Sequence, residues 1–306
     1  MNPVTVVVIV ICGGRHTERC IRALLEQRDA PPFDIVVAHS PSLPGISNLL
    51  QPFASVRGVV EPGKHTPMDL AALGLREAHG ETVLAIEDHC VPEPDWIRVL
   101  SRAVTPDRGA VGGTIEPDAR LSPLGWAFYY VDFFRYMRPV VEGPAHSISH
   151  CNVAYRRAAL EAIRSSWEGG FHETAAHETL RRRFGALWLI PDATVHMGRN
   201  VALPAAIRER YQLGRLYGAR RLEFASPAKR FLFALAAPAL PVLLLARYAT
   251  KAVQRMDILR QFIRCLPDLA VLTLAWSWGE WLGYLTRRAP ETIAFASEVA
   301  PAGSST

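Results

Sequence analysis

Residues 84–96 read LAIEDHCVPEPDW, and this stretch decides how the first half of the chain is expected to fold. A short aliphatic run at residues 82–86 predicts a buried strand, which delivers Glu87, Asp88 and His89 in succession at its carboxyl end. Two prolines then end the strand, and the aspartate at position 95 is expected to cap the next helix. Open α/β sheets bind ligands outside the carboxyl ends of their strands, so the triplet predicts a site there.

The chemistry of this triplet suggests a metal ion. Oxygen and imidazole donors together suit Mg²⁺ or Mn²⁺, and either ion in turn suits a diphosphate. The alternative interpretation is an acidic turn on a solvated loop.

Apolar runs alternate with helical patterns on both sides of this strand. Strands are expected near residues 4–12, 34–38, 56–61, 82–86 and 110–115, and helices near 17–27, 68–78 and 95–104. Such alternation predicts an α/β fold with a mostly parallel central sheet and helices on both faces. After the first strand, the loop Gly13-Gly14-Arg15 either lets the backbone approach a nucleotide or is only a tight turn, for which glycine is the usual residue.

Length and composition fit one large domain followed by an appendage. The chain has 306 residues, of which 49% are hydrophobic, and this is enough for a sizeable core. We expect a domain at residues 1–225, hydrophobic membrane-associating helices at 226–290 and a disordered tail at 291–306. The five cysteines include no C-x-x-C pair, which favours a reducing compartment. The β-branched run at the start predicts a buried strand and not a signal peptide.

The last quarter of the chain contains two long apolar runs, at residues 231–246 and 269–285. Basic residues separate them: Arg247, Lys251, Arg255, Arg260 and Arg264. A two-span hairpin would place this basic segment outside, against the positive-inside tendency. We therefore expect an interfacial or re-entrant pair against anionic lipid, on the cytoplasmic face of the bacterial inner membrane. The alternative is a buried helical subdomain. A net charge of +5 fits a membrane surface, and no nucleic-acid module is visible, so no nucleic acid is expected.

Several motifs together resemble family 2 glycosyltransferases, which have the GT-A fold. The resemblance runs from Val4 to about Arg199 and rests on the opening VTVVVIVI, the helix CIRALLEQ, the segments GAVGGTIEP and HCNVAYRRAAL, and the stretch quoted first. Where the family usually has three Asp, this chain has Glu87-Asp88-His89. The resemblance implies an inverting enzyme that moves a sugar from a nucleotide-sugar donor to an acceptor, with Asp88 and His89 at a divalent ion.

The same resemblance suggests further donor-site residues. Asn152 is expected to hold a sugar hydroxyl and Arg156 or Arg157 a phosphate, unless the arginines only begin a solvated helix at residues 158–163. His196 either completes the metal site or packs in the interior. The donor-binding set is Gly13, Gly14, Arg15, Glu87, Asp88, Asn152 and Arg156, and the metal set is Asp88, His89 and His196.

The general base is left open because the chain departs from the family here. Family members carry Glu-Asp where this chain has Ala176-His177, and that Asp deprotonates the acceptor hydroxyl. A histidine can act as base near neutral pH, and so can a glutamate whose pKa is raised. His177, Glu178 and Glu173 therefore remain competing candidates, with Glu178 on the helix surface as the alternative for that residue.

The acceptor is expected to be lipid-linked or an envelope polysaccharide. After the second strand, the sequence Ala38-His39-Ser40-Pro41 lacks the acidic residue with which the family holds the nucleobase. The nucleobase and the sugar of the donor are therefore not predicted. Two other functions stay open: a non-catalytic membrane-associated protein that binds a nucleotide sugar or polymer, and a metal-dependent hydrolase. The sequence does not predict the oligomeric state.

Overall fold

The computed structural model describes residues 3–43, 45–63, 66–221, 226–290 and 293. The chain forms two compact units, which we call the sheet unit (Met1–Asp118 with Tyr136–Gly198) and the helical unit (Ala119–Arg135 with Arg199–Thr306). This division differs from the expected boundary at residue 225, because two helices that precede it belong to the helical unit. The predicted tail lies outside the described residues, apart from residue 293.

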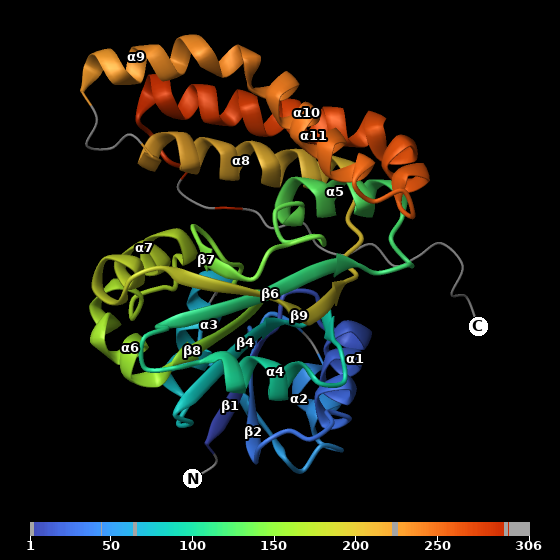
Figure 1. Cartoon of the computed structure of the whole chain (residues 1–306), viewed down its shortest axis with the longest axis vertical. Coiled ribbons are helices and arrows are strands. Elements are labelled where there is room, and N and C mark those ends of the chain that lie inside the picture. Colours follow the sequence, from blue (N-terminus) through green and yellow to red (C-terminus); the bar gives the residue numbers. More distant parts are fainter. Residues whose placement is uncertain (1–2, 44, 64–65, 222–225, 291–292, 294–306) are drawn as a thin grey trace. The chain divides into compact units, whose positions relative to one another are not determined.

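The sheet unit is built around one sheet, as the alternating pattern predicted (Figure 1). Its described strands are β1 (Val4–Ile9), β2 (Phe33–Ala38), β3 (Val56–Val59), β4 (Thr82–Glu87), β5 (Cys90–Pro92), β6 (Ala110–Pro117), β7 (Gly143–Ala145), β8 (Asn152–Arg156) and β9 (Leu187–Met197). They lie in the order β3-β2-β1-β4-β8-β6-β9-β5, and β7 pairs with β9. The first four are parallel, whereas β8 runs antiparallel to both of its neighbours. The predicted α/β fold is confirmed.

Helices cover both faces of this sheet. They are α1 (Gly14–Leu25), α2 (Ile46–Leu50), α3 (Pro67–Arg76), α4 (Trp96–Ala103), α6 (Arg157–Ala162), the 3-10 turn η1 (Arg164–Ser166) and α7 (Glu173–Phe184). Because side chains alternate along a strand, Val7 and Ile9 join a core with residues of α3, α6 and α7, while Val6 and Val8 are buried on the other face.

Local sequence explains where α3 and α4 begin. Thr66 and Asp69 form a capping box, in which each side chain accepts the other residue's backbone N–H, at 3.3 and 2.8 Å. Asp95 stands at the cap position of α4 as expected, but its carboxylate makes no capping bond and instead accepts from Arg98 at 2.8 Å. The predicted cap is therefore right in position and wrong in contact.

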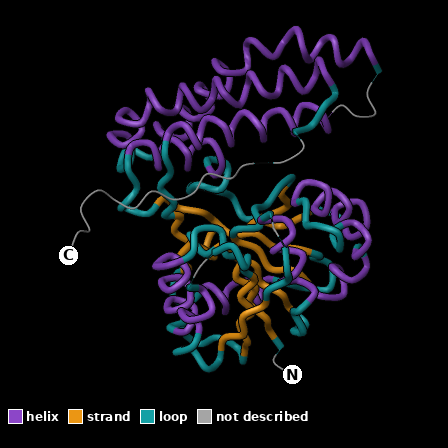
Figure 2. The backbone as a smooth tube through the Cα atoms, turned by 180° about the vertical axis from the view of Figure 1, so that it is seen from behind, coloured by secondary structure: helices purple, strands orange, loops and turns teal. Residues whose placement is uncertain are grey.

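The helical unit contains no strand among its described residues (Figure 2). Its elements are α5 (Pro123–Phe133), α8 (Leu203–Arg221), α9 (Pro227–Ala236), the 3-10 turn η2 (Ala237–Ala239), α10 (Leu240–Val253) and α11 (Leu259–Thr286). Helices α8 and α11 touch through glycines spaced four apart. A Cβ on Gly214 would lie 2.2 Å from the Trp276 carbonyl oxygen, and one on Gly279 would lie 2.1 Å from that of Tyr211. Only residues without side chains permit this approach.

A buried ionic cluster lies between α5 and α8. Arg210 is 1% exposed, and its guanidinium bonds to Asp132 and to Glu209 (2.8 Å) while it covers the Phe128 ring at 4.4 Å. Arg199 also donates to Glu209, at 3.3 Å. Each buried charge thus has a partner of opposite sign, which is the condition for placing charges in an apolar interior.

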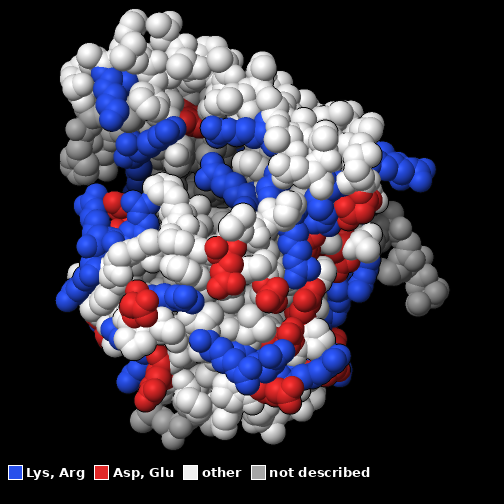
Figure 3. All heavy atoms as spheres, in the orientation of Figure 1, with Lys and Arg blue, Asp and Glu red and all other residues white. Residues whose placement is uncertain are grey.

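Helices α9 to α11 of the helical unit expose many apolar side chains. Among the described residues, one helical segment, Pro227–Val253, is long and apolar enough to cross a membrane, with mean hydropathy 1.8 and 17% of its apolar window buried. Exposed large side chains on α9 to α11 include Phe231, Leu232, Leu235, Val242, Leu243, Leu274 and Trp278. Figure 3 shows broad uncharged areas over these helices, interrupted by Lys and Arg.

Candidate active site

Asp88 lies buried at the end of β4, and its carboxylate is fully hydrogen-bonded. One oxygen accepts the backbone N–H groups of Ile11 (2.9 Å) and Cys12 (3.0 Å). The other accepts the N–H of Gly13 (2.7 Å) and the hydroxyl of Thr17 (2.8 Å). Burial raises the pKa of Asp88, and these hydrogen bonds oppose that rise. Four donors occupy the acceptor sites of a carboxylate, so Asp88 holds the loop after β1 and has no lone pair left for an ion.

That loop begins α1 and is open on its outer side. Gly13 has φ +76° and Gly14 has φ +53°, both in the left-handed region, and a Cβ on Gly14 would meet nothing within 4 Å. Arg15 is exposed beside them. The backbone here is accessible to a ligand, and binding of a nucleotide by these residues stays a prediction.

Next to Asp88, four side chains form what we call the carboxylate–imidazole cluster: Glu87, His89, His150 and Glu173. His89 Nε2 lies 3.4 Å from Glu87 Oε2, and His150 Nδ1 lies 3.8 Å from a carboxylate oxygen of both Glu87 and Glu173. The backbone N–H of His150 also donates to Glu173 Oε2 at 3.1 Å. Burial lowers the pKa of His150 to about 4, so this imidazole is neutral at pH 7. The cluster joins β4, the segment before β8 and the start of α7.

Cysteines surround His89, which the sequence reasoning did not anticipate. His89, Cys90 and Cys151 place one ligand atom each within 4.8 Å of one another, and so do Cys12, Asp88 and His89. The dipeptide His-Cys occurs twice in the sequence, at 89–90 and 150–151, and this repeat could have indicated the arrangement. The prediction from the sequence named oxygen and imidazole donors but no thiolate, so Cys90 and Cys151 were missed. His150 was missed because its carboxylate neighbours, Glu87 and Glu173, belong to distant segments of the chain.

Asn152 lies inside the sheet unit, where its side-chain amide links four elements. It is fully buried; its oxygen accepts from Trp96 Nε1 (2.7 Å), and its nitrogen donates to the carbonyls of Thr114 (2.7 Å) and Ala193 (2.8 Å). Both amide hydrogens are therefore used within the protein. In this arrangement Asn152 fixes β8 against β6, β9 and α4, and it offers no hydrogen to a sugar.

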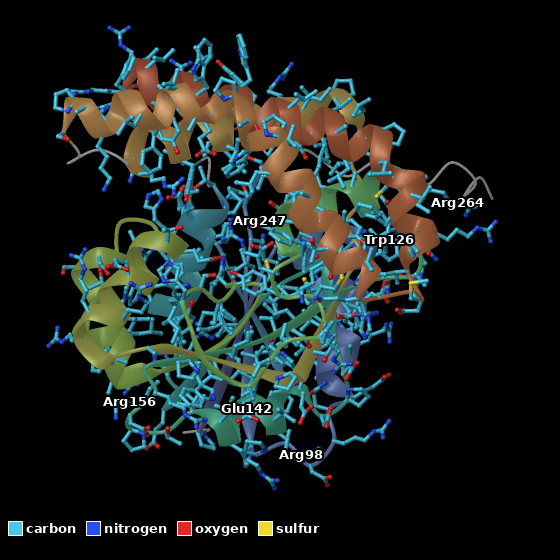
Figure 4. All side chains as sticks on the ribbon, turned by 45° about the horizontal axis from the view of Figure 1, so that its top comes forward. Arg98, Trp126, Glu142, Arg156, Arg247 and Arg264 are labelled. Atoms are coloured by element: carbon cyan, nitrogen blue, oxygen red, sulfur yellow. The ribbon has the colours of Figure 1, made fainter. Side chains whose placement is uncertain are left out.

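Arg156 lies at the opposite end of the strands from the cluster, next to the amino end of β4. The register pairs Ile86 with Asn152 and Thr82 with Arg156, so Arg156 is five residues along β4 from Glu87, or about 16 Å at 3.3 Å per residue. Figure 4 labels Arg156 and also Arg98, which lines a pocket together with Thr82 at the same end. The strand register therefore places Arg156 too far from the cluster for the expected contact with a donor phosphate. Arg157 is exposed at the start of α6.

Of the three candidate bases, only Glu173 belongs to the cluster. His177 is 4% exposed and its Nε2 lies 2.8 Å from the Tyr155 hydroxyl; burial, and then nearby His150, lower its pKa to about 3. Glu178 pairs on the surface of α7 with two arginines, at 2.8 and 2.9 Å. The Glu173 side chain is 36% exposed and therefore accessible to a substrate.

His196 lies on β9, where it pairs in register with Val91. Its Nε2 is 3.3 Å from Glu93 Oε1 and its side chain is 41% exposed. Neither group of potential metal ligands among the described residues includes His196.

Comparisons with known proteins show the family and the fold. The family model described as "Glycosyl transferase family 2" matches residues 5–164, more than half of the chain. Among solved structures, the chain is similar to the mannosyltransferase PcManGT from Pyrobaculum calidifontis in complex with GDP-Man and Mn²⁺, with TM-score 0.60 and 18% identity over 91% of this chain and 87% of that one. It is also similar to S. aureus TarS 1–349 in complex with UDP-GlcNAc, with TM-score 0.52 and 12% identity over 90% and 92%. No curated protein matches it.

Proposed function

Because the chain belongs to glycosyl transferase family 2, we propose that it is an inverting glycosyltransferase that moves a sugar from a nucleotide-sugar donor to a lipid-linked or envelope-polymer acceptor. The observation that carries the proposal is the carboxylate–imidazole cluster, which lies at the carboxyl end of β4 and directly beside the open loop after β1. Ligands of open α/β sheets bind at this edge. The similar structures contain GDP-Man and UDP-GlcNAc, which supports a nucleotide-sugar donor here.

We propose that the donor diphosphate lies along the loop Gly13-Gly14-Arg15. Gly14 is exposed and leaves room for close approach of phosphate oxygens, and Arg15 supplies an exposed positive charge. The role of Asp88 in this scheme is to hold the loop, through the three backbone N–H groups that it accepts.

The residues beside the loop are suited to a divalent ion. Glu87 offers a carboxylate and His89 an imidazole, 3.4 Å apart, in place of the fully bonded Asp88. An ion bound there would neutralise the charge of the leaving diphosphate. The Mn²⁺ of the similar mannosyltransferase supports a divalent ion.

Glu173 is the base in this proposal. Its carboxylate accepts the proton of the acceptor hydroxyl while that oxygen attacks the anomeric carbon from the side opposite the diphosphate, which inverts the configuration. The His150 backbone N–H fixes one Glu173 oxygen at 3.1 Å and leaves the carboxylate accessible.

The helical unit supports a membrane acceptor. The exposed apolar side chains of α9 to α11 would insert among acyl chains, while Lys and Arg contact anionic headgroups of the cytoplasmic leaflet. A cavity of about 270 Å³ lined by Pro238, Pro241, Trp278 and Trp281, among others, opens on the same helices and offers an apolar surface to a lipid.

A second candidate is a binding protein that no longer transfers sugar. The burial of His177, where the family has its base, favours this alternative. It predicts donor binding without turnover.

Turnover of a panel of nucleotide sugars with acceptor lipid extract separates the two candidates. Glu173→Gln should lower turnover about 10²–10⁴-fold with little change in donor affinity, because the amide cannot take the proton. Glu178→Gln is the matched control on the same helix and should retain activity. If Glu173→Gln is as active as the wild type, Glu173 is not the base; if the wild type binds a donor but never turns it over with any acceptor, the binding protein is correct.

A further inference from the structure

Three of the five cysteines lie near the carboxyl ends of β1 and β4, where the proposed donor site is. Cys12 follows β1, Cys90 begins β5 and Cys151 immediately precedes β8. Of the remaining two, Cys20 lies within α1 and Cys265 within α11. Thiols from three separate segments therefore converge on His89.

Two of these thiols and the imidazole already have the spacing of a metal site. Ligand atoms of His89, Cys90 and Cys151 lie within 4.8 Å of one another, and the three residues are 2%, 0% and 5% exposed. Around a tetrahedral ion with bonds of about 2.0–2.3 Å, ligand atoms are separated by roughly 3.3–3.8 Å. Closing the site requires side-chain movements of about an ångström.

The donor types decide which ion fits. Mg²⁺ requires oxygen ligands, but Asp88 is fully hydrogen-bonded, which leaves Glu87 as the carboxylate next to His89. Imidazole and thiolate are ligands of Zn²⁺ and similar borderline-soft ions. Beside the site, Nε2 of His150 is buried without a hydrogen-bond partner among the described residues. One polar atom next to the site is therefore still able to accept or donate a hydrogen bond.

We propose that His89, Cys90 and Cys151 bind Zn²⁺, with a fourth position for an oxygen ligand from Glu87 or from the donor diphosphate. The two thiols release their protons to solvent as they bind. Three protein ligands and one exchangeable position are the pattern of zinc sites that take part in a reaction. The role of this ion in transfer rests on the proposed function, whereas its binding does not.

The test uses Co²⁺ as a spectroscopic substitute for Zn²⁺ on the chelator-treated full chain, without donor or acceptor. We expect one ion per chain, with a near-ultraviolet charge-transfer band from cobalt–thiolate bonds that Zn²⁺ abolishes and equimolar Mg²⁺ or Mn²⁺ does not. Cys90→Ser and Cys151→Ser should each weaken Zn²⁺ binding at least about tenfold, and Cys265→Ser, a buried cysteine of the helical unit, should not.

Absence of the band in the wild type overturns the proposal, even if a serine variant fails to fold. Displacement of bound Co²⁺ by equimolar Mn²⁺ overturns it as well, and so does unchanged Zn²⁺ affinity in both serine variants. A chain that binds Zn²⁺ through these thiols but transfers no sugar would contradict only the proposed function.

Discussion

The two units bury charge in different ways. In the sheet unit, the negative charge of Asp88 is balanced by backbone N–H groups of a loop, so this carboxylate shapes the surface to which a donor would bind. In the helical unit, the buried charge of Arg210 is balanced by the carboxylates of Asp132, on α5, and of Glu209, on its own helix. Asp88 therefore fixes the conformation of a loop at the candidate site, whereas Arg210 stabilises the packing of α5 against α8.

The largest expected effect on stability comes from removing Arg210 from the buried ionic cluster of the helical unit. Arg210→Met would leave Asp132 and Glu209 without their shared partner and should lower the free energy of unfolding by about 3–5 kcal/mol. Urea denaturation measures this change. Arg208→Met, on the exposed side of the same helix, is the control and should stay within about 0.5 kcal/mol of the wild type. A similar small change for Arg210→Met would mean that the buried pairs contribute nothing.

A smaller effect is expected for the carboxylate that holds the loop. Asp88→Asn keeps one acceptor oxygen but turns an N–H toward Gly13 and Thr17, so two donors lose their acceptor. We expect a loss of about 2–4 kcal/mol in urea denaturation and at least about tenfold weaker donor binding by calorimetry. Asp95→Asn, whose carboxylate pairs with the partly exposed Arg98, is the control. Unchanged stability together with lost metal binding would instead identify Asp88 as an ion ligand.

The smallest effects concern charges of the helical unit that are not buried. Arg247 and Arg264 are exposed on α10 and α11 (Figure 4), and reversal of either to Glu should weaken binding to anionic vesicles by at least about 1 kcal/mol. Sedimentation with vesicles measures this, and added salt should weaken wild-type binding in the same way. Arg157→Glu, exposed in the sheet unit, should have no such effect. Binding that resists both salt and alkali would indicate a membrane-spanning helix in place of interfacial contact.

Much of the fold was predictable because it depends on neighbours in sequence. The predicted strands and helices of residues 1–115 agree with β1 to β4, β6, α1, α3 and α4 within a few residues. Alternation of apolar side chains, a capping box and two prolines act over a few positions, and each can be read without knowing the tertiary structure.

For the candidate site, the sequence predicted a location but not the contacts of its residues. The sequence indicated the carboxyl end of β4 and the importance of Glu87, Asp88 and His89, but adjacent residues in a strand have the same polarity signal whether they face a ligand or the interior. Asp88 finds its partners 71 to 77 positions earlier in the chain, and these contacts determine that it holds a loop.

By itself, therefore, the sequence determined the family, the α/β elements, the edge of the sheet where chemistry is expected and the apolar character of the C-terminal helices. Tertiary structure decided which residues meet there. Strand register moved Arg156 to the far end of the strands, antiparallel pairing of β4 with β8 brought Cys151 to His89, and close glycine contacts joined α8 to α11. Short-range patterns follow from local steric preference, whereas a site depends on contacts between segments far apart in the chain, and register and packing create those contacts.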